Sequence, residues 1–290
     1  TKHSVRYLIE CAFKEIGQTI VWKGSGVDEI GIDRASGKTR VSIDPRYFRP
    51  TEVDLLLGDP SKAKDKLGWQ HSTDFETMIK EMVASDLVVD VICATYNGAR
   101  HLPEFLASLR AQEHVAWRLW CRDDGSDDGT LLLLRDEAQR DVRVRVVEDA
   151  RGRLGVTQSF GALLQQVASQ AQYVMCADQD DVWMPHKIQT SMARMRQVET
   201  RYSGPVLVHT DLRVVDGDLH PVADSFWTLT HLRPEPATVP RMVLQGLVTG
   251  ATVLVNRELL ERALPVPGDA IMHDWWLAAV ATSCGVVEAI

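Results

Sequence analysis

The chain has 290 residues, of which 45% are hydrophobic and 25% are charged, a composition that is typical of soluble globular proteins and excludes intrinsic disorder. Its formal net charge is −8 and its pI is about 5.6, which argues against binding to nucleic acids or anionic membranes through basic patches. We therefore expect no nucleic-acid partner.

Lysine and arginine are distributed unevenly along the chain. Residues 1–86 contain 8 lysines and 5 arginines, whereas residues 87–290 contain 18 arginines and a single lysine, Lys187. This change indicates two parts of different origin, with a boundary after residue 86.

The cysteines, the uncharged runs and the chain ends each give one expectation. The five cysteines show no CxxC spacing, so a reducing, cytoplasmic setting fits better than a zinc site or a disulfide framework. The longest uncharged runs, 242–256 and 275–287, are shorter than the roughly 20 apolar residues of a membrane-spanning helix. The chain starts at Thr1 and ends in an apolar stretch, so we expect a fragment truncated at its C-terminus.

Residues 1–86 predict a small α+β segment. Periodicity and turn residues indicate, in order, a helix over 5–16, strands over 19–22 and 40–43, and a helix over 73–83. The second helix opens with a capping box, Thr73-Asp-Phe-Glu76. Gly24-Ser-Gly26 lacks the third glycine of a dinucleotide-binding fingerprint, because Glu29 occupies its position, and therefore indicates a loop.

Strands and helices alternate in residues 87–290. The predicted strands cover residues 87–94, 115–121, 142–147, 173–177, 206–208 and 247–255. The predicted helices cover residues 102–109, 131–139 (capped by Thr130) and 156–169, with a further helix opened by Pro185 and another through 275–277. This alternation is typical of an α/β domain with a mostly parallel sheet and helices on both faces.

Polar residues gather where the predicted strands end. Ligands of open α/β sheets bind beyond the carboxyl ends of the strands, and Tyr96, Asp123 and Asp124 follow the first two strands of this part of the chain. Asp123 and Asp124 are candidates to accept hydrogen bonds from a nucleobase or ribose, and Tyr96 is a candidate to stack on a base. Alternatively, these carboxylates serve local turn bonding and Tyr96 covers the turn.

The fourth of these strands ends in Asp178-Gln-Asp-Asp181. In extended chain Asp178 and Asp180 point to the same side, so both carboxylates can face one divalent cation. The alternative is a solvated acidic turn or a helix N-cap. Later in the chain, His209 and Asp211 suit either a metal or acceptor contact or a structural hydrogen bond, and Gly250 is placed to lie beneath an acceptor.

Two resemblances to known families extend these interpretations. The run Asp44-Pro-Arg-Tyr-Phe-Arg-Pro-Thr-Glu-Val-Asp54 and its continuation to Trp69 resemble the C-terminal segment of GDP-mannose 4,6-dehydratases, over most of residues 3–86. The resemblance implies that Arg49 and Glu52 lie near a guanine nucleotide. The dinucleotide loop and catalytic set of that family are absent from this chain, so we expect a remnant rather than a dehydratase.

Residues 88–290 resemble a family 2 glycosyltransferase of the GT-A fold, in its rhamnosyltransferase-like branch. The matching motifs are Ala94-Thr-Tyr-Asn-Gly98, Arg122-Asp-Asp-Gly-Ser-Asp-Asp-Gly-Thr130, Leu154-Gly155, Ala177-Asp-Gln-Asp-Asp-Val-Trp183 and His273-Asp-Trp-Trp276. The resemblance implies a nucleotide site at Thr95, Tyr96, Asp123, Asp124 and Asp178, and Mg²⁺ or Mn²⁺ at Asp178, Asp180 and Asp181.

By the same resemblance Asp274 is the catalytic base, for which a helix N-cap is the structural alternative. The expected activity is a metal-dependent, inverting transfer of sugar from a nucleotide donor to a glycan or lipid-linked acceptor in polysaccharide or O-antigen synthesis. The expected location is the cytoplasm, with or without peripheral attachment to the inner face of the membrane. A fused dehydratase remnant and a non-catalytic nucleotide-sugar-binding protein remain as alternatives; the donor, the acceptor and the oligomeric state are left open.

Overall fold

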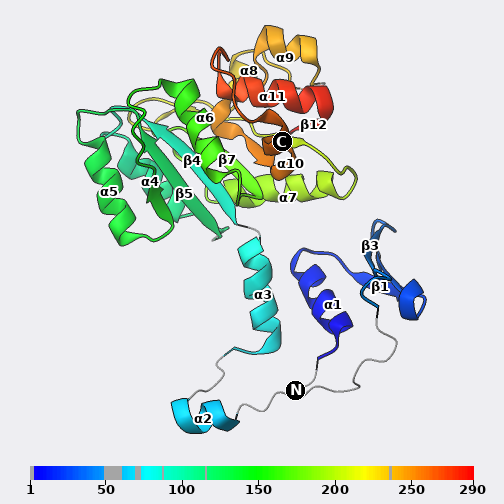
Figure 1. Ribbon diagram of the computed structural model, residues 1–290. Helices are drawn as coiled ribbons and strands as arrows, with labels where there is room; N and C mark the ends of the chain where they lie inside the picture. Colours follow the sequence, from blue (N-terminus) through cyan, green and yellow to red (C-terminus); the bar gives the residue numbers. More distant parts are fainter. Residues whose placement is uncertain (1–2, 49–60, 69–72, 87, 115, 235–236) are drawn as a thin grey trace. The chain divides into compact units, whose positions relative to one another are not determined.

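The computed structural model describes residues 3–48, 61–68, 73–86, 88–114, 116–234 and 237–290. The chain divides into two compact units, Thr1–Asp86 and Leu87–Ile290, whose elements are labelled in Figure 1. Each unit is described by itself.

The first unit combines helices with a small antiparallel sheet. Its elements are α1 (Val5–Glu15), β1 (Ile20–Lys23), the 3₁₀ turn η1 (Gly26–Asp28), β2 (Ile30–Asp33), β3 (Thr39–Ser42), α2 (Ser61–Leu67) and α3 (Phe75–Asp86), with the strand order β1-β2-β3. Helix α1 begins where the Ser4 hydroxyl accepts the N–H of Tyr7 at 3.1 Å, an N-cap bond. Tyr7 also stacks on Phe75 of α3 and donates a hydrogen bond to Glu76, so the two helices pack together.

Two sequence expectations for this unit need correction. The cap of α3 is Asp74 rather than Thr73, because the Asp74 carboxylate accepts the N–H of Thr77 at 2.8 Å. Strand β2 was not predicted: its centre is Gly31, where a Cβ would lie 2.9 Å from the Ile20 side chain, and glycine is an unfavourable strand residue unless another element approaches closely. Arg49 and Glu52 lie outside the described residues.

The second unit is built on a seven-stranded sheet with the order β12-β8-β11-β7-β4-β5-β6. The strands are β4 (Val89–Thr95), β5 (Trp117–Asp123), β6 (Val144–Val146), β7 (Tyr173–Ala177), β8 (Val206–His209), β11 (Leu254–Asn256) and β12 (Val286–Ala289). Strand β11 runs antiparallel to its neighbours β7 and β8, and the other recorded pairings are parallel. The predicted mostly parallel α/β sheet is confirmed.

Helices cover both faces of this sheet (Figure 1). They are α4 (Leu102–Arg110), α5 (Thr130–Arg140), α6 (Val156–Val167), α7 (Lys187–Glu199), α8 (Phe226–Leu229), α9 (Val239–Gln245), α10 (Arg257–Ala263) and α11 (His273–Cys284). The alternation of strand residues divides the core in two. Val91 and Cys93 of β4 pack with α4, α5 and α7, whereas Ile92 between them packs with α6, α10 and α11.

The predicted strand over 247–255 is wrong in most of its length. A 3₁₀ turn, η2 (Gly250–Thr252), interrupts it, and the Thr252 hydroxyl donates a 2.6 Å bond to the carbonyl of Thr249. Only Leu254–Asn256 pairs in the sheet. A short ribbon of β9 (Val214–Val215) and β10 (Pro221–Ala223) completes the unit.

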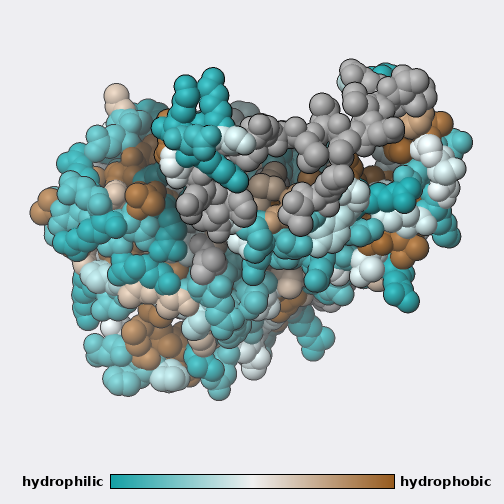
Figure 2. Space-filling model, turned by 90° about the horizontal axis from the view of Figure 1, so that it is seen from below, coloured by the Kyte–Doolittle hydropathy of each residue, from teal (hydrophilic) through white to brown (hydrophobic). Residues whose placement is uncertain are grey.

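The buried hydrophobic clusters lie in the second unit. On the face that Figure 2 shows, hydrophilic side chains predominate and hydrophobic ones occupy separate areas. Within the described ranges, no helix is long and apolar enough to cross a bilayer.

Candidate active site

Three neighbouring strands end at one edge of the large sheet and bring together most of the predicted site residues. In the register of β4, β5 and β7, Thr95 lies opposite Asp123 and Cys93 lies opposite Ala177. Just beyond these ends is a cavity of about 270 Å³, whose lining includes five predicted residues: Thr95, Tyr96, Asp124, Asp178 and Asp180. We call it the edge cavity.

Gln179 joins the acidic segment to the end of β4. Its side-chain oxygen accepts the N–H of Tyr96 at 3.0 Å, and its amide nitrogen donates to the carbonyl of Tyr96 at 2.9 Å. This pairing requires glycine at position 98, where a Cβ would lie 2.1 Å from the Gln179 oxygen. Gln179 therefore fixes the segment while Asp178 and Asp180 line the cavity.

Asp123 is used by its own turn. Its carboxylate accepts hydrogen bonds from the Thr95 hydroxyl at 3.0 Å, the Ser126 hydroxyl at 2.6 Å and the N–H groups of Ser126 and Gly125 at 2.9 and 3.2 Å. It is not among the residues that line the edge cavity. The local-turn alternative describes Asp123 better than a nucleoside contact does.

Asp124 lines the cavity, but both of its oxygens are already engaged. One accepts from Arg122 at 2.7 Å, Leu154 N–H at 2.7 Å and the Ser159 hydroxyl at 3.1 Å, and the other accepts from Gly155 N–H at 2.8 Å. Burial works to raise the pKa of Asp124, yet these donors bring it below its usual value. Asp124 thus anchors the loop that ends in Gly155.

Arg122 holds the other end of this loop. Its guanidinium bonds Asp149 at 3.1 and 3.2 Å and the carbonyl of Gly152 at 2.5 Å, and the pKa of Asp149 is strongly lowered by the bond from Arg122. We call residues 149–155 the anchored loop. It carries Arg153, whose guanidinium carbon lies 4.0 Å from the ring centroid of Tyr96, a cation–π contact within the cavity lining.

The carboxylates of Asp178, Asp180 and Asp181 have different surroundings from that of Asp124. In the described part of the chain, no recorded hydrogen bond reaches their side-chain oxygens. Burial, followed by the negative charges of Asp181, Asp180 and Asp274, raises the pKa of Asp178 to about 7, and burial raises the pKa of Asp181 as well. We call these three residues the acidic cluster.

The acidic cluster fits a hard divalent cation that shares its coordination sphere with a substrate. Carboxylate oxygens without hydrogen-bond donors are suitable ligands for Mg²⁺ or Mn²⁺ and repel one another in the absence of a cation. Within the described ranges, no three acidic, histidine or cysteine side chains form a complete metal site. Mg²⁺ in phosphate-transfer sites is commonly held by one or two carboxylates plus substrate phosphates, which matches this donor set.

Lys187 supplies a fixed positive charge beside the cluster. Its ammonium donates to the carbonyl of Ala251 at 2.6 Å and lies 3.9 Å from the ring centroid of Trp183. Burial lowers the pKa of Lys187 to about 8, while Asp181 and Asp178 act in the opposite direction. Lys187 therefore links the acidic segment to the 3₁₀ turn η2.

Asp274 lies on the other side of that turn. It is buried in the first turn of α11, with its oxygen Oδ1 2.8 Å from the N–H of Trp275, and a Cβ on Gly250 would lie 3.2 Å from Oδ2. Burial raises the pKa of Asp274. The cap of α11 is Met272, so the N-cap interpretation of Asp274 is wrong.

The histidines near these residues are buried and packed against aromatic rings. His273 stacks on Phe160 with ring centroids 3.9 Å apart, both of its ring nitrogens lack hydrogen-bond partners among the described residues, and burial lowers its pKa to about 4. Burial likewise lowers the pKa of His209 to about 4. Asp211 accepts bonds from Ser225 at 2.5 Å, Leu212 N–H at 2.7 Å and Trp227 N–H at 3.1 Å, as the structural-bond alternative predicts.

Gln179, Arg153 and Lys187 were not predicted as site residues. The partner of each comes from another part of the chain, and a lone arginine or glutamine in a loop carries no periodicity. The single available signal was compositional, because Lys187 is the only lysine in residues 87–290.

Comparisons with known proteins match the two parts of the chain to two different families. The family model of GDP-mannose 4,6 dehydratase matches residues 1–82. The GDP-mannose 4,6-dehydratase of Sinorhizobium fredii is 58% identical over 84 residues, which are 29% of this chain and 24% of that protein. The chain therefore spans about a quarter of the length of that relative.

The second unit resembles solved glycosyltransferases. The mannosyltransferase PcManGT from Pyrobaculum calidifontis, in complex with GDP-Man and Mn²⁺, superposes with a TM-score of 0.52 at 21% identity, over 70% of this chain and 54% of that one. S. aureus TarS 1–349 in complex with UDP-GlcNAc gives 0.53 at 16% identity, over 70% and 56%. These likenesses show a GT-A-type fold. The family model of glycosyl transferase family 2 matches residues 90–255, more than half of the chain, which therefore belongs to that family.

Proposed function

We propose that residues 87–290 transfer a sugar from a nucleotide-sugar donor, with inversion at the anomeric carbon and with Mg²⁺ or Mn²⁺ bound. The observation that carries this proposal is the position of the acidic cluster in and beside the edge cavity, with carboxylates that accept no hydrogen bond from the described residues. The complexes of the two structural relatives contain GDP-Man with Mn²⁺ and UDP-GlcNAc.

The donor is proposed to bind with its nucleoside in the edge cavity against Thr95 and Tyr96. Asp178 and Asp180, with Asp181 beside them, would hold the cation, which when bound offsets negative charge on the departing diphosphate. Arg153 brings a positive charge to the same cavity. The Arg122–Asp124 bonds to the anchored loop keep Arg153 in position before the donor arrives.

Asp274 is proposed as the base. Inverting transfer requires a carboxylate that removes the proton of the acceptor hydroxyl as its oxygen attacks the anomeric carbon. Burial raises the pKa of Asp274, which increases its strength as a proton acceptor, and its negative charge contributes to the raised pKa of Asp178. A sugar donor bound at the acidic cluster and an acceptor bound at Asp274 can react only if Asp178 and Asp274 lie close together.

The acceptor is proposed to be a glycan or a lipid-linked saccharide in polysaccharide or O-antigen synthesis, at the cytoplasmic side of a membrane. This part of the proposal depends on the sequence motifs shared with the rhamnosyltransferase-like branch, notably Asp178-Gln-Asp-Asp-Val-Trp183 and His273-Asp-Trp-Trp276.

The test is hydrolysis of GDP- and UDP-sugars with Mn²⁺ by the parent chain and by Asp180→Ala. We expect a loss of at least about 100-fold, because the cation contributes several kcal/mol of charge stabilisation. Asp127→Ala, which removes an exposed carboxylate that does not line the edge cavity, is the matched control. Equal turnover in parent and Asp180→Ala contradicts the metal assignment, and Mn²⁺-dependent nucleotide binding without any turnover favours a non-catalytic binding protein.

A second candidate function, for residues 1–86, is favoured by the 58% identity to a GDP-mannose 4,6-dehydratase. We propose that Arg49 and Glu52 retain part of a guanine-nucleotide pocket. Calorimetric titration of the full chain and of Arg49→Ala with GDP and NADP tests this proposal. Equal GDP affinity in both proteins contradicts the pocket, and an absence of NADP binding excludes dehydratase activity.

A further inference from the structure

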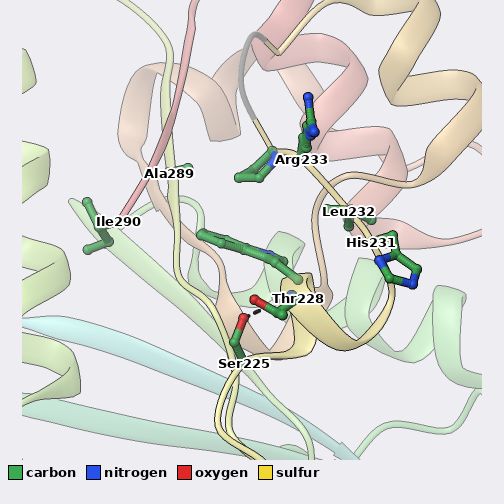
Figure 3. Close-up of a pocket in the computed structure, with 9 residues that line it drawn as sticks. Ser225, Thr228, His231, Leu232, Arg233, Ala289 and Ile290 are labelled. Carbon is green, nitrogen blue, oxygen red and sulfur yellow. Dashed lines mark hydrogen bonds between the residues drawn. The ribbon is translucent and has the colours of Figure 1, made fainter.

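A second and larger cavity lies at the carboxyl end of β8, away from the edge cavity. Its volume is about 680 Å³, within the range of sites that hold small organic ligands. Its lining includes Ser225, Trp227, Thr228, His231, Arg233 and Ile290. Figure 3 shows Ile290 at one side of it and His231 at the other. We call it the β8 cavity.

Trp227 is held firmly in the wall of the β8 cavity. Its backbone N–H donates to Asp211 at 3.1 Å, its backbone carbonyl accepts from Leu232 N–H at 2.8 Å, and its ring makes an edge contact with His209 at 5.6 Å between centroids. Asp211 is itself fixed by the Ser225 hydroxyl at 2.5 Å. The backbone of Trp227 is thus fixed and its ring contacts His209 before any ligand arrives, which reduces the entropy that binding must overcome.

The lining combines an aromatic ring with exposed polar groups. Thr228, His231 and Arg233 contribute a hydroxyl, an imidazole and a guanidinium around the indole of Trp227. A pyranose ring has the matching surface, because its C–H groups form apolar faces and its hydroxyls project from the rim. Aromatic side chains that bury an apolar face beside polar groups suit such amphipathic ligands, and Arg233 adds a preference for a neutral or anionic sugar.

The sheet order places the β8 cavity at the same edge of the sheet as the turn η2, which contacts Asp274. Strand β11 separates β8 from β7, and the turn η2 that precedes β11 contacts Lys187 on one side and Asp274 on the other. The acidic cluster follows β7, so the proposed site of the sugar donor, Asp274 and the β8 cavity lie at one edge of the sheet. Among the described residues, no aspartate or glutamate lines the β8 cavity, unlike the edge cavity with Asp178 and Asp180.

We infer that the β8 cavity binds a saccharide unit of the acceptor, with its pyranose ring against Trp227. The inference rests on the proposed glycosyltransferase function and adds the chemical class and the position of the second substrate. Trp227 acts here in acceptor binding, while donor binding and donor hydrolysis depend on the edge cavity and the acidic cluster.

The test uses the full chain and a panel of methyl hexopyranosides as probes, with binding followed by saturation-transfer NMR. We expect Trp227→Ala to weaken the best-bound glycoside at least about tenfold, whereas Trp227→Phe retains most of the binding. Leu229→Ala is the matched control, because Leu229 is an exposed residue of the same helix that does not line the cavity. Donor hydrolysis with Mn²⁺ should change less than about twofold in all three variants.

Equal glycoside binding by parent and Trp227→Ala, or no binding by the parent, overturns the inference. If Trp227→Ala does not fold, Arg233→Ala provides the same comparison by removing an exposed side chain of the lining. Glycoside binding that depends on Trp227 in a chain without donor hydrolysis supports the saccharide site and contradicts the proposed transferase activity, so the two failures are distinguishable.

Discussion

Replacing Asp124 by asparagine separates two roles that this residue could have. As a nucleotide ligand, Asp124 would leave folding unchanged when it is replaced. As the anchor of residues 149–155, it would contribute to both stability and binding. Its two oxygens accept four hydrogen bonds, from Arg122, Ser159, Leu154 and Gly155, so the structure predicts the second behaviour.

The magnitude follows from the donors that asparagine leaves unpaired. An amide NH₂ must replace one oxygen, and the less costly orientation points it at the N–H of Gly155, which loses its 2.8 Å bond. The bond from Arg122 also becomes weaker, because its acceptor is no longer charged. Hydrogen bonds to charged groups contribute about 1.5–3 kcal/mol each, so we expect a loss of about 3 kcal/mol in the free energy of unfolding. For a unit of this size, that corresponds to a Tm lower by about 6–12 °C.

The assay is urea unfolding of the full chain, fitted with separate transitions because the two units need not unfold together. Nucleotide affinity is measured by calorimetry with GDP and with UDP in the presence of Mn²⁺. We expect weaker nucleotide binding, since the released loop no longer holds Arg153 beside Tyr96. Asp127→Asn is the control: Asp127 is exposed, and no recorded hydrogen bond from a described residue reaches its carboxylate.

Loss of nucleotide affinity in Asp124→Asn without any change in unfolding free energy would refute this reasoning. It would mean that the carboxylate contacts the nucleotide directly and that the bonds to the anchored loop contribute little to stability.

Two further predictions concern acid stability and the base. Burial lowers the folded-state pKa of His209 and of His273 to about 4, so the unfolded chain, with a histidine pKa near 6.5, binds more protons below that pH. Each histidine therefore contributes a loss of up to about 3 kcal/mol of stability between pH 6.5 and pH 4, whereas the pKa of Asp178, raised to about 7, acts in the opposite direction. The change in unfolding free energy from pH 7 to pH 5 is therefore compared between the parent and His209→Gln, and the same change in both would contradict this. Gly250→Ala places a Cβ 3.2 Å from the Asp274 oxygen. We therefore expect kcat for sugar transfer to fall about 10- to 100-fold while the affinity for the sugar donor is unchanged. Steady-state kinetics with an unaltered kcat would count against Asp274 as the base.

The elements that could be predicted are those whose signal is local. Strand β7 has the predicted bounds, Tyr173–Ala177, because a short apolar run that is buried on both sheet faces ends abruptly in charged residues. The same reasoning was wrong for residues 247–255. There, a bond from the Thr252 hydroxyl to a carbonyl three residues earlier favours a 3₁₀ turn over the extended conformation that β-branched residues otherwise prefer.

The contacts that shape the site could not be predicted, because they join residues far apart in the chain. Gln179 bonds Tyr96 across 83 positions, and Arg122 bonds Asp149 across 27. Strand spacing indicates which residues arrive at one edge of a sheet. It does not indicate which arginine, glutamine or carboxylate there finds a partner, since this depends on side-chain geometry after the strands have paired.

The acidic turn around Asp123 and the acidic cluster nevertheless differ in a way that is already visible in their sequences. Asp123 lies in a turn rich in glycine and serine, and the N–H and hydroxyl groups of Gly125 and Ser126 saturate its carboxylate. Asp178-Gln-Asp-Asp181 has no glycine or serine within it, and its glutamine is used by Tyr96. Burial, and after it the charges of Asp181 and Asp180, raise the pKa of Asp178; carboxylates without local hydrogen-bond donors repel one another, and a cation is the partner that removes this repulsion. The absence of turn donors, more than the number of carboxylates, is therefore what distinguishes a candidate metal segment from an acidic turn.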